Sequence, residues 1–71
     1  MPKLPVVSGR DAIKALSRLG FVAVRRKGSH VVLTGNGRTF AVPIHPELDR
    51  GTLRAILREA NVSVKAFVDA L

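Results

Sequence analysis

The chain has 71 residues, no cysteine and a formal net charge of +7, from twelve lysines and arginines against five acidic residues. This length accommodates one small domain spanning residues 1–71, and the lack of cysteine excludes a disulfide framework and a thiolate metal site. The excess of positive charge favours a polyanionic partner, although some of the cations will simply occupy solvated positions.

Membrane association is not indicated by the sequence. No segment approaches the roughly 20 apolar residues of a membrane span, and the first residues lack the apolar run of a signal peptide. The three aromatic residues, Phe21, Phe40 and Phe67, stand where core residues are expected. We therefore expect a cytoplasmic protein.

The first predicted element is a helix over residues 9–19. Ser8 and Asp11 have the spacing of an N-cap followed by an acidic third helical residue. Apolar residues then recur at helical spacing, at Ala12, Ile13, Leu16 and Leu19. Gly20 is suited to end this helix.

Three segments rich in β-branched residues follow, at residues 21–26, 29–34 and 38–44. Gly35-Asn36-Gly37 is typical of a tight hairpin because glycine and asparagine tolerate positive φ, and Lys27-Gly28 makes the earlier connection. Pro43 and Pro46 close the strand region, since proline cannot donate a ladder hydrogen bond. These segments predict three antiparallel strands.

Two helices are predicted in the C-terminal part. Asp49 can cap the first, which carries an apolar stripe on one face and Arg50, Arg54 and Arg58 on another. Ser63 can cap a last short helix that ends near Leu71. The order α-β-β-β-α, with a short C-terminal helix, predicts an α+β fold with helices on one face of a three-stranded antiparallel sheet.

The candidate site is the stretch from Arg25 to Val31, where His30 follows three cations, Gly28 and Ser29. Imidazole transfers protons near neutral pH, and neighbouring cations can hold a phosphodiester while it does so. Strand alternation groups His30 with Val32 and Thr34, the more polar set, so we place His30 on the open sheet face. Alone, a strand histidine is far more often structural than catalytic.

Three motifs in order resemble the HicA family of toxin ribonucleases. They are Gly28-Ser29-His30 after a basic strand, Val-Pro-Ile-His-Pro at 42–46, and Gly-Thr-Leu-Arg-Ala-Ile-Leu-Arg-Glu-Ala at 51–60. The resemblance covers almost the whole chain, including the pair Gly20-Phe21 and the closing segment 64–71. It implies a fold like that of the double-stranded RNA-binding domain, which agrees with the element order predicted above.

This resemblance implies an mRNA interferase, the toxin of a type II toxin-antitoxin system, neutralised by a HicB-type antitoxin that covers the active histidine. The family's histidine maps onto His30, and the preceding glycine and serine onto Gly28 and Ser29. The family's other basic positions vary too much to be transferred. On charge and position alone, the further RNA-binding candidates are Arg25, Arg26, Lys27 and Arg38, which lie on the hairpin strands or at their ends.

RNA carries its own nucleophile, the ribose 2′-hydroxyl, so cleavage needs only proton transfer and charge stabilisation. We therefore expect an endoribonuclease that uses no metal and no cofactor. The neighbouring cations disfavour imidazolium and so favour His30 as the base, although the acid role stays open. Ser29 either donates to a phosphate oxygen or only completes the turn.

Three other interpretations have to be weighed. A non-catalytic RNA-binding module would use the same basic surface, and a protein-interaction subunit would bind an acidic partner with it. A metal site built from both histidines with Glu47 or Asp49 is disfavoured, because Pro46 restrains the loop and no close histidine pair exists. Arg54 and Arg58 could follow an RNA backbone or simply face water.

Overall fold

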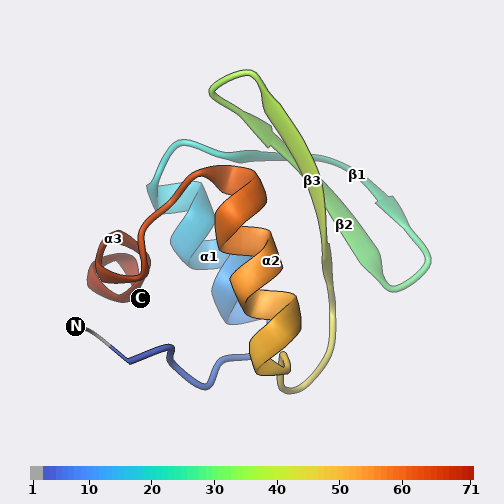
Figure 1. The fold of residues 1–71 in the computed structure, drawn as a ribbon. Coiled ribbons are helices and arrows are strands. Elements are labelled where there is room, and N and C mark those ends of the chain that lie inside the picture. The colour runs from blue at the N-terminus through green and yellow to red at the C-terminus, as the bar shows by residue number, and fades with distance from the viewer. Residues whose placement is uncertain (1–2) are drawn as a thin grey trace.

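The computed structural model describes residues 3–71, shown as a ribbon in Figure 1. The elements are α1 (Gly9–Arg18), β1 (Val22–Lys27), β2 (His30–Gly35), β3 (Arg38–Pro43), α2 (Arg50–Ala60) and α3 (Val64–Ala70). The strands form one sheet in the order β1-β2-β3, with both pairs antiparallel. The predicted α+β fold is therefore confirmed, with boundaries shifted by one or two residues.

Two of the helices, α1 and α3, have their N-termini capped by a serine side chain. The hydroxyl of Ser8 accepts a hydrogen bond from the Asp11 amide at 3.0 Å, and Ser63 accepts one from the Ala66 amide at 3.0 Å. Asp49 is the N-cap residue of α2 but makes no side-chain capping bond. The caps predicted at Ser8 and Ser63 are confirmed, because each short polar side chain satisfies an amide that the helix leaves free, whereas the side-chain cap predicted at Asp49 does not form.

Gly20 ends α1 as predicted. Its φ is +99°, and its amide donates to the Ser17 carbonyl at 3.1 Å while the amide of Phe21 donates to the Leu16 carbonyl at 3.0 Å. This pair of bonds is the Schellman arrangement, which turns the chain out of the helix. Phe21 is thereby placed just before β1 with its ring in the core, 2% exposed.

Helices α1 and α2 cover one face of the sheet, and α3 packs beside α1 (Figure 1). Leu33 of β2 and Val42 of β3 are fully buried on the covered face. Phe40 is buried beside them, and its ring packs edge-to-face on that of Phe21 with the ring centroids 5.3 Å apart. Phe67 of α3 is fully buried as well. Since side chains alternate along a strand, the burial of Leu33 puts the neighbouring His30, Val32 and Thr34 on the open face.

Both hairpins have loops of two residues. Asn36 and Gly37 join β2 to β3 with φ values of 51° and 73°, the type I′ pattern. The loop joining β1 to β2 is Gly28-Ser29, with φ of 61° at Gly28 and a negative φ at Ser29, as in a type II′ turn. The predicted loop Lys27-Gly28 was wrong by one residue, because Lys27 pairs with His30 in the ladder.

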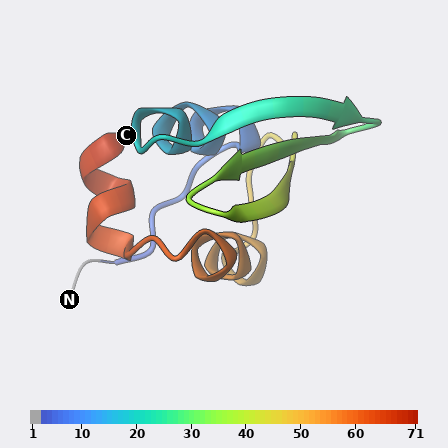
Figure 2. The same ribbon diagram turned by 90° about the horizontal axis from the view of Figure 1, so that it is seen from above.

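The β1–β2 hairpin projects beyond the helix layer, as Figure 2 shows from above. All six residues of β1 are exposed, whereas β2 and β3 bury side chains where the helices cover them. The tip of the hairpin is therefore an open surface supported by the rest of the domain.

The connection from β3 to α2 is held by the segment before α1. The Gly9 amide donates to the His45 carbonyl at 2.9 Å, and the Leu48 amide donates to the Val7 carbonyl at 2.8 Å. Gly9 approaches so closely that a Cβ there would lie 2.0 Å from the Pro43 carbonyl oxygen. Among residues 3–71, no helix has the length and apolar character needed to cross a membrane.

Candidate active site

His30 is the first residue of β2 and follows the Gly28-Ser29 turn directly. It lies between two cross-strand neighbours, Lys27 of β1 and Pro43 of β3, and its side chain is exposed. Directly paired residues point to the same face of a sheet, so the Lys27 ammonium shares the open face with the imidazole. A fixed cation and a proton-transfer group are thus adjacent, as the sequence predicted.

Strand pairing in β1, which contains a β-bulge, places Arg25 on the same face. The pairing passes from Ala23 opposite Leu33 to Arg25 opposite Val32, which leaves Val24 without a partner. From the turn to Arg25 the pairing is regular, so alternation places Arg25 and Lys27 on the face of His30 and Arg26 on the other face, opposite Val31. The extra residue changes the register beyond Arg25 and so puts Ala23 opposite Leu33, on the covered face.

The main chain of the turn is fixed on both sides. Arg26 donates from Nε to the Gly28 carbonyl at 3.0 Å, and the Ile44 amide donates to the Ser29 carbonyl at 2.6 Å. The second bond shows that His30 and Pro43 form a non-hydrogen-bonded pair, so Pro43 loses no ladder bond by lacking an N–H. The turn before His30 is therefore tied to β3 as well as to β1.

Arg38 does not join this group. It pairs with Gly35 at the other end of β2, five residues from Pro43, which is about 17 Å along the strand. Its guanidinium donates from Nη1 to the Glu59 carbonyl in the last turn of α2 at 3.1 Å. A cation bonded to carbonyls at a helix C-terminus stabilises the helix, a role that sequence reasoning missed because the contact spans 21 residues.

His45 lies in the connection between β3 and α2 with its side chain exposed. The hydrogen bond that fixes this connection runs from the Gly9 amide to the main-chain carbonyl of His45, and the imidazole takes no part in it. Within the described range, no group of three His, Asp or Glu side chains is placed to hold a metal ion.

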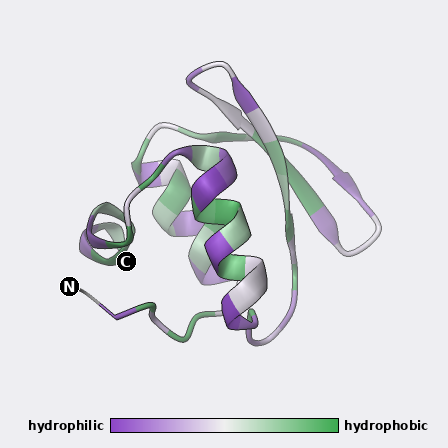
Figure 3. Cartoon of the chain, in the orientation of Figure 1, coloured by the Kyte–Doolittle hydropathy of each residue, from purple (hydrophilic) through white to green (hydrophobic). Residues whose placement is uncertain are grey.

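The basic residues at the hairpin tip keep their charge exposed. Between Lys3 and Leu71, the one ion pair is that of Lys65 with Asp69 at 2.7 Å in α3, where this hydrogen bond and the charge attraction raise the pKa of Lys65. Figure 3 shows the tip of the hairpin as a hydrophilic region. With no carboxylate bound to them there, Arg25 and Lys27 are free to pair with an anionic ligand.

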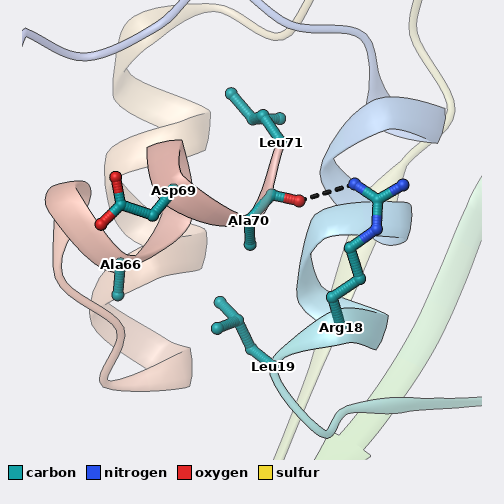
Figure 4. A pocket seen from close by; sticks show the side chains of 6 residues that line it. All are labelled: Arg18, Leu19, Ala66, Asp69, Ala70 and Leu71. Carbon is teal, nitrogen blue, oxygen red and sulfur yellow. Dashed lines mark hydrogen bonds between the residues drawn. The ribbon is translucent and has the colours of Figure 1, made fainter.

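A shallow hollow lies elsewhere on the molecule, between α1 and the C-terminal helix (Figure 4). Arg18 crosses it and donates from Nη1 to the Ala70 carbonyl at 2.6 Å, again at a helix C-terminus. No hairpin residue lines this hollow. The surface around His30 is instead open, which suits an extended polymer better than a small enclosed ligand.

Chemically, the arrangement offers an exposed imidazole for proton transfer and two cations on the same face to stabilise negative charge. The sequence did not predict the β-bulge at Val24, because nothing in the residue pattern of this strand marks an inserted residue.

Comparison with protein families shows a match to the HicA toxin of bacterial toxin-antitoxin systems over residues 9–62. The matched region runs from the start of α1 through the sheet and α2. A search of curated proteins finds no match.

Proposed function

The chain belongs to the HicA toxin family of bacterial toxin-antitoxin systems, and on that premise we propose that it is an endoribonuclease that cleaves mRNA. The observation that supports this most directly is the placement of His30 beside Lys27 on an open basic face. An imidazole next to a fixed cation has the two parts that RNA cleavage requires, a proton acceptor and a stabiliser of phosphorane charge.

The reaction proceeds by attack of the ribose 2′-oxygen on the adjacent phosphorus. The neutral imidazole of His30 takes the proton of the 2′-hydroxyl as the new P–O2′ bond forms. The P–O5′ bond then breaks, and the departing 5′-oxygen takes a proton from water. The products are a 2′,3′-cyclic phosphate and a free 5′-hydroxyl, and no metal or cofactor enters any step.

The cations around His30 differ in their distance from the reacting phosphate. Lys27 is directly opposite His30 and stabilises the charge that develops on the non-bridging oxygens, while Arg25 on the same face holds the RNA backbone. Arg38 lies about 17 Å along the sheet, on the face of Phe40, and its guanidinium donates to the Glu59 carbonyl, so we assign it no contact with the reacting phosphate. Arg26 faces the other way, and Gly28 lets the RNA approach the turn without a Cβ.

Family membership implies an antitoxin partner. We take this partner to be a HicB-type protein that binds the toxin directly and covers the face bearing His30. An exposed, uncompensated basic surface favours acidic side chains on the antitoxin, which would exclude RNA by occupying the same cations. Since its substrate is mRNA, the toxin acts in the cytoplasm.

The test compares His30→Ala with His45→Ala, a matched control because His45 is also exposed but lies outside the basic face. His30→Ala should lose cleavage by at least about 10²-fold, which is the lower range of proton-transfer catalysis, and should abolish growth arrest on induction. His45→Ala should retain both. The measurement is cleavage of a 5′-labelled RNA, with mass spectrometry to identify the 2′,3′-cyclic phosphate.

Undiminished cleavage by folded His30→Ala would refute the assignment of the base. RNA that binds the wild-type protein but is never cleaved would select the non-catalytic RNA-binding module instead. A strong complex with an acidic protein and no RNA affinity at low salt would select the protein-interaction subunit.

A further inference from the structure

We infer that the main-chain amide of Ser29 is a second phosphate-binding group of the site and that Arg26 positions it. This inference rests on the proposed function for its catalytic readout. The orientation of the Ser29 amide is supported by the hydrogen bonds of the turn. This amide helps the same site to recognise a phosphodiester.

The peptide between Gly28 and Ser29 has a defined direction in the turn. Its carbonyl accepts a hydrogen bond from Arg26 Nε at 3.0 Å, and Arg26 lies on the face opposite to His30. In a planar trans peptide the carbonyl and the N–H point in opposite directions. The Ser29 N–H is therefore directed to the face that carries His30 and Lys27.

The N–H of Ser29 makes no hydrogen bond within the described residues. In the hairpin ladder His30 pairs with Lys27, and the Ser29 carbonyl is taken by the Ile44 amide. Within residues 3–71 the Ser29 amide donates no hydrogen bond, and Ser29 itself is exposed. An accessible, oriented amide one residue before the imidazole can donate to a phosphate oxygen at no reorganisation cost.

Arg26 favours one of the two orientations that this peptide can adopt. The peptide in the middle of a two-residue turn can flip, and the flip exchanges the type II′ and type I′ forms. Gly28 has φ of 61°, which both forms accept, so the glycine does not by itself fix the peptide. The bond from Arg26 favours the orientation in which the N–H faces His30, which makes Arg26 a positioning residue rather than a ligand of the RNA.

The decisive comparison is Ser29→Pro against Ser29→Ala. Both remove the hydroxyl, but only proline removes the N–H. The negative φ of Ser29 suits the proline ring, and its N–H makes no bond within the protein, so the fold should tolerate the change. We expect kcat for Ser29→Pro to fall about 10²-fold below that of Ser29→Ala, the usual loss on removing one oxyanion donor.

A second comparison separates Arg26 from Arg25, using Arg26→Gln and Arg25→Gln, which remove the same charge. Arg25→Gln should raise KM and reduce the slope of log affinity against log salt by about one unit. Arg26→Gln should lower kcat, leave that slope unchanged and shift the amide resonance of Ser29. Identical behaviour of the two variants would overturn the positioning role.

Titration of the wild-type protein with inorganic phosphate, followed by amide NMR, tests phosphate binding independently of RNA cleavage. A saturable shift of the Ser29 amide together with the His30 side-chain resonances supports the inference even if the protein proves not to be a ribonuclease. A shift of the His30 resonances with the Ser29 amide unmoved would overturn it, as would equal kcat for folded Ser29→Pro and Ser29→Ala.

Discussion

Gly9→Ala is a substitution for which helix propensity and tertiary structure predict opposite signs. Gly9 is the first residue of α1, where alanine should favour the helix by up to about 1 kcal/mol. In the folded domain, however, a Cβ at this position would lie 2.0 Å from the carbonyl oxygen of Pro43 and 3.0 Å from Cα of Ile44. Both neighbours are main-chain atoms, so no side-chain rotation relieves the contact.

The expected magnitude follows from what must move. Relief requires α1 to separate from the end of β3, which weakens the bond from the Gly9 amide to the His45 carbonyl. Loss of that bond costs about 0.5–1.5 kcal/mol, and an overpacked contact about 1–3 kcal/mol. After the gain in helix propensity, the free energy of unfolding should fall by about 2 kcal/mol, which lowers Tm by about 8–16 °C in a domain of this size.

Gly51→Ala is the matched control, because Gly51 lies in the first turn of α2 and is exposed. A Cβ there meets only the Asp49 carboxylate at 3.7 Å, an ordinary contact. This variant should therefore gain up to about 1 kcal/mol. Thermal unfolding followed by circular dichroism measures both. If Gly9→Ala were as stable as the wild type or more so, the close approach of α1 to β3 would be refuted.

Three further outcomes are expected. Arg38→Ala should lower the free energy of unfolding in urea by about 1 kcal/mol, because the Glu59 carbonyl loses its donor, and an unchanged value would show that the bond does not stabilise α2. Pairing with Asp69 raises the pKa of Lys65 above its ordinary value of 10.5. The stabilisation that this pair contributes is therefore present below pH 10.5 and is lost as the pH rises through the folded-state pKa. The small Tm difference between wild type and Asp69→Asn should therefore narrow above that pH. RNA cleavage should persist in excess EDTA, and activity lost with EDTA but restored by a divalent cation would contradict the metal-free mechanism.

Much of the fold could be predicted because its signals are local. Ser8, Ser63 and Gly20 begin or end helices through bonds within a few residues, and Asn36-Gly37 allows the two positive φ values of its turn. The outward placement of His30 followed from alternation within β2 alone. Each of these inferences depends on neighbours in sequence.

The predictions that failed or stayed incomplete depend on how segments meet. The loop Gly28-Ser29 was misplaced by one residue because Lys27 and His30 become partners only through pairing of the two strands. Arg38 was grouped with the hairpin cations because all lie on strand ends, yet β2 separates them by its length.

The sequence by itself determined the elements, their order, the family and the identity of the one histidine that stands beside a basic run. Strand pairing decided which of three consecutive cations accompany His30, because the turn at Gly28-Ser29 pairs Lys27 with His30, and alternation then puts Arg25 on the same face and Arg26 on the other. Tertiary structure also turned Arg26 toward the Gly28 carbonyl and so oriented the turn. The physical reason is that the face of a strand residue is set by its partner strand, which the local sequence does not specify.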